Sequence, residues 1–505
     1  MNRRVPKRFR RRTTCFLCLA WTAAVSFAAA TPSSAEPSES ATPSLPAIRG
    51  VLRVCRQNPL FFADGEGQAI YLVGHQGFVD LQDNAFNKPF VWNGRRRLDW
   101  PAYLDFLCAH RFNYVRNWIV WSTGSGAMAP ENDAVAWPMP YRRVAGYGKA
   151  RDGGDKFDLN TFDEAFFDRM RRRCEDLQAR GVYVSIMLFE VYGFLDGEAC
   201  GNPPQTLWDG NLFNRANNVN DIDTDTNGDG KGIEFFYTSD PRIRKLQRDY
   251  VRKVIDTVGH LDNVFFEIAN ELYAPQWQYA MIEFVKSYEQ TKPKQHLVLL
   301  SPGGRTPTGD WRRMPRALVV NSPADCFAVA GSWNDNAFRR MNPPPNDAGK
   351  PGIVDMDHVA AGSAEIGYVW SAFTRGYHFN LYDKPFERPE TEGPEWARIR
   401  SNLTQVARYA SEMNLLRTKP ASELADSGFC LAERGRVYVV YAPKGGTITL
   451  DLSDAPAVFA AEWFDPTRVR TLPGGTVEGG TSVRYTAPFS GPAVLRLQAM
   501  KHPAR

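Results

Sequence analysis

The chain has 505 residues, of which 43% are hydrophobic, so it can bury a large core and form about two to four domains. Its net charge of +5 does not indicate a nucleic-acid partner, because much of the positive charge lies in the first twelve residues. The composition therefore predicts a multidomain globular protein and gives no reason to expect nucleic-acid binding.

A targeting signal is predicted at the amino terminus. Basic residues precede an apolar run from Cys15 to Ala30, and Ser33-Ser34-Ala35 supplies the small residues of a cleavage site. The run is too short to span a membrane comfortably, so a signal peptide over residues 1–35 is preferred to a short membrane anchor. Arg11-Arg12 fits a twin-arginine signal poorly. We expect a secreted or periplasmic bacterial protein with no transmembrane anchor after cleavage, followed by a disordered Ser/Pro/Ala/Glu-rich linker over residues 36–50.

The cysteines do not predict a metal site. Those that remain after signal removal are spaced too widely for metal ligation. Export permits disulfides, but buried thiols are the expected state for most of them. These residues are Cys55, Cys108, Cys174, Cys200, Cys326 and Cys430.

Strand and helix patterns alternate between residues 51 and 415. Trp100–His110 and Phe162–Arg180 have helical apolar stripes, and each is followed by a strand pattern. This alternation predicts a (β/α)8 TIM barrel. A doubly wound open sheet is the alternative, but no Gly-rich nucleotide loop follows the first strand. The predicted strands are Ala69–Val73, Tyr114–Trp121, Val182–Phe189, Val264–Ile268, His296–Leu300, Cys326–Ala330, Gly352–His358 and Tyr377–Asp383.

The pattern changes over residues 416–505. Short alternating runs such as Val437–Tyr441 and Ala493–Leu497 are separated by Gly, Pro and Asp, which predicts a small all-β sandwich domain. Trp463 is expected to pack in its core rather than to stack on sugars.

The predicted chemistry lies at the carboxyl ends of the barrel strands, where TIM-barrel active sites are built. Glu271 follows Asn270 at the end of the fourth strand, and Asp355 and Asp357 close the seventh. Retaining glycoside hydrolysis needs a carboxylic acid and a carboxylate about 5 Å apart, and strands four and seven lie on opposite sides of a barrel. A Glu that merely begins the next loop, and a structural salt bridge for Arg116, are the alternatives. The residues expected to bind substrate are His75, Gln76, Arg116, Asn117, Trp121, Glu190, Asn270, Asp355 and His358.

These residues carry a resemblance. Ile268-Ala269-Asn270-Glu271, with Arg116 on the second strand, resembles the clan of retaining (β/α)8 glycoside hydrolases that includes the cellulase-like family 5 enzymes. More narrowly, the chain from about Val51 onward looks like a bacterial group of cellulase-like proteins related to apiosidase-type barrels, which often end in a sandwich of the collagen-binding type. The motifs are Asn58–Gly65, Phe213–Asn220, Trp277–Tyr279 and Asp355–His358. The resemblance implies a monomeric hydrolase of O-glycosidic bonds in a polysaccharide or oligosaccharide, with no cofactor required for catalysis.

The seventh strand departs from the clan, which presents a Glu there as nucleophile. Placing the Asp-Gly-Glu of apiosidase-type barrels over Asp355-Met356-Asp357 puts Asp357 at the nucleophile position, with Glu271 as acid/base. Aspartate is one methylene shorter, so either the backbone lies closer to the substrate or the carboxylate separation widens toward the inverting range. A catalytically inactive carbohydrate- or matrix-binding barrel is the alternative. Metal-dependent hydrolysis is disfavoured, because the histidines do not cluster with carboxylates at strand ends.

A separate motif between strands three and four predicts a structural calcium ion. Residues 223–234 match a calcium loop with oxygen ligands at positions 1, 3 and 5, Gly228 at position 6 and Glu at position 12. Gly230 stands where an apolar residue is usual, so a solvated turn is the alternative. The predicted ligands are Asp223, Asp225, Asn227, Asp229 and Glu234.

Overall fold

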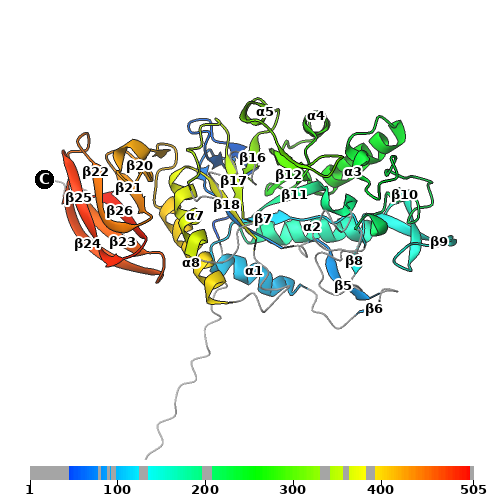
Figure 1. Ribbon diagram of the computed structural model, residues 1–505, viewed down its shortest axis with the longest axis horizontal. Helices are drawn as coiled ribbons and strands as arrows, with labels where there is room; N and C mark the ends of the chain where they lie inside the picture. The colour runs from blue at the N-terminus through cyan, green and yellow to red at the C-terminus, as the bar shows by residue number, and fades with distance from the viewer. Residues whose placement is uncertain are drawn as a thin grey trace, which may run out of the picture. The chain divides into compact units, whose positions relative to one another are not determined.

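Eight parallel strands close into a barrel, which confirms the predicted TIM-barrel fold (Figure 1). The computed structural model describes residues 45–77, 81–87, 91–92, 98–123, 135–195, 207–329, 342–356, 363–382 and 393–500. Around the barrel the strands are β4 (Val73–Gln76), β7 (Tyr114–Asn117), β11 (Tyr183–Glu190), β12 (Val264–Asn270), β13 (Val298–Leu300), β16 (Cys326–Val329), β17 (Gly352–Asp355) and β18 (His378–Tyr382).

Helices follow most barrel strands, and their starts have sequence signals. Asp99, Asp163 and Asp240 each accept a hydrogen bond from a backbone N–H of the first helical turn, as N-cap residues do. The helices are α1 (Trp100–Ala109), α2 (Glu164–Ala179), α3 (Pro241–Val258), α4 (Pro275–Glu289), α5 (Arg316–Val320), α7 (Ser363–Thr374) and α8 (Pro394–Ser411). Single 3-10 turns are η1 (Tyr192–Phe194), η2 (Trp208–Gly210) and η3 (Ile233–Phe236).

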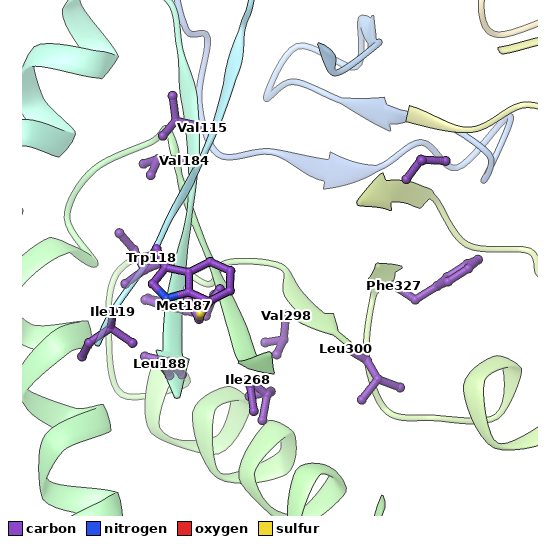
Figure 2. Close-up of a cluster of buried hydrophobic side chains, with 14 of the residues drawn as sticks. Val115, Trp118, Ile119, Val184, Met187, Leu188, Ile268, Val298, Leu300 and Phe327 are labelled. Atoms are coloured by element: carbon purple, nitrogen blue, oxygen red, sulfur yellow. The ribbon is translucent and has the colours of Figure 1, made fainter. Parts of the chain in front are cut away.

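The barrel interior is layered. Tyr114 and Phe265 stack in an apolar layer, with ring centroids 5.5 Å apart. Two residues further along the same strands, on the same face, lie Arg116 and Glu267, so a polar layer follows the apolar one. Other residues of these strands, such as Ile268 of β12, belong to the main hydrophobic core (Figure 2).

The first barrel strand lies further along the chain than predicted. Ala69–Ile70 pairs with Phe62–Ala63 in a small antiparallel sheet, and the barrel strand begins only at Val73. The small sheets consist of β1 (Arg53–Val54), β2 (Phe62–Ala63) and β3 (Ala69–Ile70); β5 (Asp83–Asn87), β6 (Val91–Trp92) and β8 (Val135–Trp137); β9 (Tyr141–Lys149) and β10 (Asp155–Phe162); and β14 (Gly303–Arg305) and β15 (Trp311–Arg313).

The carboxyl-terminal region is all-β, as predicted. A six-stranded sheet in the order β19-β20-β21-β26-β23-β24 accompanies the pair β22-β25. Trp463 is 2% exposed and stacks on Tyr485, so its ring is part of the core. The elements are β19 (Lys419–Pro420), η5 (Ser422–Leu424), β20 (Cys430–Glu433), β21 (Val437–Ala442), β22 (Gly445–Asp451), β23 (Val458–Asp465), β24 (Arg470–Glu478), β25 (Ser482–Ser490) and β26 (Ala493–Ala499).

The cysteines within the described ranges are buried free thiols, in line with the prediction for most of them, whereas Cys200 lies outside those ranges. Among the described helices, none has the length and apolar character needed to cross a membrane.

Candidate active site

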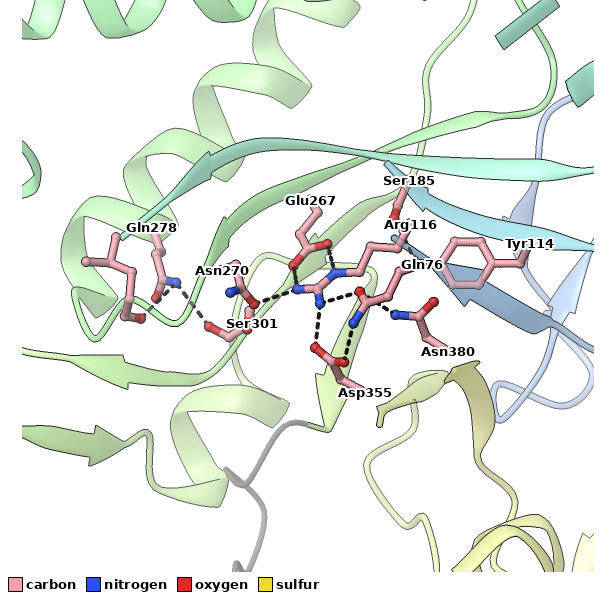
Figure 3. A network of polar contacts seen from close by, with 11 residues as sticks. Gln76, Tyr114, Arg116, Ser185, Glu267, Asn270, Gln278, Ser301, Asp355 and Asn380 are labelled. Atoms are coloured by element: carbon pink, nitrogen blue, oxygen red, sulfur yellow. Dashed lines mark hydrogen bonds and ion pairs between the residues drawn. The ribbon is translucent and has the colours of Figure 1, made fainter. Parts of the chain in front are cut away.

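A buried polar network fills the upper layer of the barrel and is centred on Arg116 of β7 (Figure 3). Its guanidinium donates two hydrogen bonds to Glu267 of β12, at 2.8 and 2.5 Å, and one to Asp355 of β17, at 2.5 Å. It also donates to Asn270 at 2.7 Å and to Gln76 at 2.9 Å. One arginine therefore joins barrel strands one, two, four and seven.

Charge balance explains why this arginine can be buried. Burial lowers the pKa of Arg116, but the carboxylates of Asp355 and Glu267 raise it well above its usual value. The guanidinium is therefore cationic and faces two carboxylates. The stability of such a buried ion-pair network depends on all its charged residues, because removing one leaves an uncompensated buried charge.

The network continues to the eighth strand. Gln76 donates from its amide nitrogen to Asp355 at 3.1 Å, and Asn380 of β18 donates to the amide oxygen of Gln76 at 2.8 Å. The Asp355 carboxylate is thus held from two sides, by Arg116 and by Gln76.

Glu271 lies where β12 ends. It follows Asn270, whose side chain is fixed by Arg116, and it is half-buried, whereas Asn270 is buried. Its backbone adopts a left-handed conformation with φ 53°. Such a conformation is uncommon for a residue other than glycine, and it occurs where surrounding contacts impose it.

Glu190, at the end of β11, is 1% exposed and is held by backbone groups. Its carboxylate accepts hydrogen bonds from the backbone N–H groups of Trp121, at 3.1 Å, and Gly193, at 2.7 Å. Burial raises the pKa of Glu190 to about 7 against the lowering effect of these N–H groups, and the charge of Glu271 contributes in the same direction as burial. The carboxyl therefore titrates near neutral pH and interacts electrostatically with Glu271.

Two residues expected to bind substrate lie elsewhere. His75 is buried against α1, where its ring nitrogen is 2.8 Å from the Tyr103 hydroxyl and its ring contacts Phe106. Its neighbour Gln76 faces the barrel interior, where it contacts Arg116. Successive side chains of a strand point to opposite faces, so His75 faces away from the interior. Trp121 is fully buried and packs on Phe189 and Tyr250 in the main core. The positions of His75 and Trp121 correct that expectation.

Asn117 is also buried, and it follows the inward-facing Arg116 on β7. The alternation of a strand therefore directs it away from the network. Asp357 and His358 lie outside the described residues, so Asp355 is the seventh-strand carboxylate whose contacts are defined.

Glu267 and Asn380 belong to the network but were not predicted from the sequence. Glu267 lies inside an otherwise apolar strand, Val-Phe-Phe-Glu-Ile, and a charged residue at such a position signals a buried partner. Asn380 lies inside another apolar strand pattern, His-Phe-Asn-Leu-Tyr, and because it is uncharged it gives no comparable signal in the sequence.

The loop from Asp223 to Glu234 is organised around Asp225. The Asp225 carboxylate accepts backbone N–H groups from Gly228 at 2.8 Å, Asp229 at 3.1 Å and Gly230 at 2.9 Å. Burial raises the pKa values of Asp223 and Glu234, and neighbouring carboxylates add to both shifts, which is an environment that a cation would relieve.

The fit to a calcium ion is partial. Asn227 donates its amide to Glu234 at 2.8 Å, so two predicted ligands contact each other. Among the described residues, no three His, Cys, Asp or Glu side chains are grouped closely enough to hold a metal ion. Oxygen donors suited to calcium are present, and the ion would require them to converge.

The protein is therefore a (β/α)8 barrel with a buried layer of charged side chains near the carboxyl ends of its strands. A family model described as a domain of unknown function, DUF6298, matches residues 131–304. A search of the curated proteins finds no match.

Solved structures share the fold. The chain is similar to the crystal structure of a glycoside hydrolase family 5 protein from Bacteroides vulgatus, with a TM-score of 0.55 and 12% identity, over 89% of this chain and 94% of that chain. It is also similar to a structure described as a glycoside hydrolase, with a TM-score of 0.54 and 11% identity, over 89% of this chain and 97% of that chain. At these identities the likeness is one of fold.

Proposed function

We propose that this protein is a glycoside hydrolase that cleaves O-glycosidic bonds of a polysaccharide or oligosaccharide. The observation that carries the proposal is the Arg116 network, which joins Asn270, the neighbour of Glu271 on the fourth strand, to Asp355 on the seventh. A carboxylic acid and a carboxylate on opposing strands are the groups that glycoside hydrolysis requires. The fold shared with glycoside hydrolases supports the same assignment.

In the proposed reaction, Glu271 donates a proton to the leaving oxygen as the glycosidic bond breaks. A seventh-strand aspartate attacks the anomeric carbon and forms a glycosyl ester, and water then cleaves this ester with Glu271 as general base, which restores both groups. The resemblance of Asp355-Met356-Asp357 to the Asp-Gly-Glu of apiosidase-type barrels favours Asp357 as the nucleophile. Arg116 and Gln76 hold the Asp355 carboxylate in place by hydrogen bonds.

We also infer export, from the predicted signal peptide over residues 1–35, and action on an extracellular or periplasmic glycan as a monomer. The closer relation to apiosidase-type barrels with a collagen-binding-type sandwich is part of this proposal and rests on the sequence motifs.

Substitution of Glu271 tests the proposal. Glu271→Gln is expected to remove hydrolysis of natural glycans and to leave the fold intact, because the amide has a similar shape but cannot deliver a proton. The loss in kcat/KM should be smaller for aryl glycosides with activated phenolate leaving groups, which need little protonation. The substrates would come from a panel of plant and bacterial polysaccharides, with product anomers followed by NMR. Equal losses on both substrate types would assign Glu271 another role.

A further inference from the structure

The hairpin of β14 and β15 packs directly on the backbone of Glu271. The N–H of Arg305 donates to the Glu271 carbonyl at 2.7 Å, and the N–H of Tyr273 donates to the Arg305 carbonyl at 3.0 Å. Leu272 and Arg305 thereby form a parallel bridge. The chain that leaves β12 is thus paired with the hairpin immediately after its left-handed residue.

Gly304 makes this approach possible. A Cβ atom at residue 304 would lie 1.8 Å from the carbonyl carbon and oxygen of Glu271 and 2.2 Å from the nitrogen of Leu272. These are backbone atoms, so no side-chain rotation relieves the overlap. Glycine is therefore required here by close packing of two backbones.

Gln278 of α4 also holds this segment by hydrogen bonds. It is fully buried, and its amide nitrogen donates to the carbonyls of Leu272, at 3.3 Å, and Ser301, at 3.1 Å (Figure 3). Ser301 lies directly after β13, just before the hairpin. One side chain therefore ties the end of the fourth barrel strand to the end of the fifth.

These contacts explain the backbone of Glu271. An unfavourable left-handed conformation persists only where the surroundings fix it, and here the Glu271 carbonyl and both following residues are fixed by neighbours. The direction of the Glu271 side chain follows from that backbone, because φ and ψ set the direction of the Cα–Cβ bond.

We propose that the β14–β15 hairpin is a positioning element for the acid/base residue, in which Gly304 and Gln278 fix the left-handed backbone of Glu271 and so aim its carboxyl at the leaving oxygen. This inference rests on the proposed function. Neither residue touches the substrate in this scheme, and both act through Glu271. Their loss should therefore impair proton donation more than substrate binding or nucleophilic attack.

The test measures kcat/KM for two glycosides of one sugar, one with an unactivated alcohol and one with a 2,4-dinitrophenolate leaving group. Gly304→Ala should lower the first value by about 100-fold or more, within the range that general acid catalysis supplies, and the second by less than about tenfold. The alkaline limb of the pH profile, which reports the catalytic acid, should also move. A general loss of folded enzyme would lower both values equally and leave that limb in place.

Gly309→Ala is the matched control. Gly309 lies in the turn of the same hairpin and also has a conformation that favours glycine, with φ 82°. A Cβ atom at residue 309 would meet no other heavy atom within 4 Å. This variant strains the hairpin without contacting Glu271, so the ratio of the two kcat/KM values should stay unchanged.

Gln278→Met keeps the test decisive if Gly304→Ala does not fold, because it removes the amide donors with a side chain of similar volume. This variant should show the same dependence on the leaving group, with a smaller loss in kcat/KM than Gly304→Ala. Parallel losses on both substrates in Gly304→Ala, or in Gln278→Met where Gly304→Ala does not fold, would overturn the inference. If Glu271→Gln itself lacks leaving-group dependence, the proposed function fails first, and the two failures are thereby distinguished.

Discussion

Asp355 and Asp357, both predicted from the sequence to close the seventh strand, have different expected roles, because Asp355 is held in the Arg116 network. Asp355 is 7% exposed and accepts hydrogen bonds from Arg116 and Gln76, so its replacement leaves part of a buried charge unpaired. Breaking a buried ion pair in this way costs about 3–5 kcal/mol of stability. Asp357 follows two residues later in the sequence and lies outside the described residues.

We therefore expect Asp357→Ala to abolish turnover and to be rescued by azide, which fills the vacated space and gives a glycosyl azide of inverted configuration. Asp355→Ala should instead lower the midpoint of denaturant unfolding without azide rescue. Product analysis by NMR with unfolding curves checks both. Azide rescue confined to Asp355→Ala would exchange the roles of the two aspartates.

Glu190 should make the stability depend on pH. Its pKa is about 7 in the folded protein, against an ordinary value of 4.5, so the folded state binds more protons than the unfolded state between these values. The stabilisation is complete below the unfolded pKa and is lost as pH rises through about 7, by an amount on the order of 3 kcal/mol. In Glu190→Gln, the fall in unfolding free energy over this window should be smaller by that amount.

Unfolding in denaturant across this pH range measures the effect. Glu66→Gln serves as the control, because Glu66 is an exposed glutamate in a surface ion pair with Arg49. Parallel curves for the wild type and Glu190→Gln would show that Glu190 has an ordinary pKa.

At the scale of elements, the calcium loop yields a test that separates metal binding from a plain turn. If residues 223–234 hold calcium, chelator should lower the melting temperature and added calcium should restore it, since a ligand that binds only the folded state stabilises that state. Asp225→Ala removes the residue around which the loop is built, and its melting temperature should be lower and insensitive to chelator. An unchanged wild-type melting temperature in chelator, with no metal by elemental analysis, would leave a solvated turn.

The elements show which parts of the fold the sequence predicts. The run Val264–Ile268 is apolar except for Glu267, as expected of a strand covered on both faces, and it is a fully buried barrel strand. The run Ala69–Val73 is equally apolar, yet it divides between a small sheet and the barrel, because hydrophobicity alone does not separate two successive strands. Barrel architecture was therefore predictable, and the position of the first strand was not.

The site shows a similar division. The sequence predicted Asn270 and Glu271 at the carboxyl end of the fourth strand, and β12 ends at Asn270. Arg116 and Glu267 are 151 residues apart, and nothing local in the sequence pairs them. His75 and Trp121 were assigned by position alone, without the strand alternation and core packing that direct them away from the network.

At the scale of the whole molecule, the main hydrophobic cluster of the barrel extends into the carboxyl-terminal sheets, which also have a second cluster of their own. Trp370 of α7 packs on Phe464 of β23, with ring centroids 5.4 Å apart, and donates to Asn402 of α8 at 2.7 Å. Asn402 in turn donates to the carbonyl of Pro466 at 3.0 Å. These contacts cross the boundary predicted between residues 415 and 416, so the two regions should unfold together.

Phe464→Ala tests this coupling. Loss of a buried aromatic side chain costs about 3–5 kcal/mol, and because the contact is shared, the loss should appear in one transition rather than in the sheet region alone. Calorimetry of the full chain should show a single transition that moves as a whole, and hydrolytic activity, which reports the barrel, should be lost at the same temperature. The control is Val458→Ala, on the same strand but 40% exposed, which should change the midpoint little. Two separated transitions, with barrel activity surviving the first, would mean that the sheets and the barrel are energetically independent despite the hydrophobic cluster that spans them.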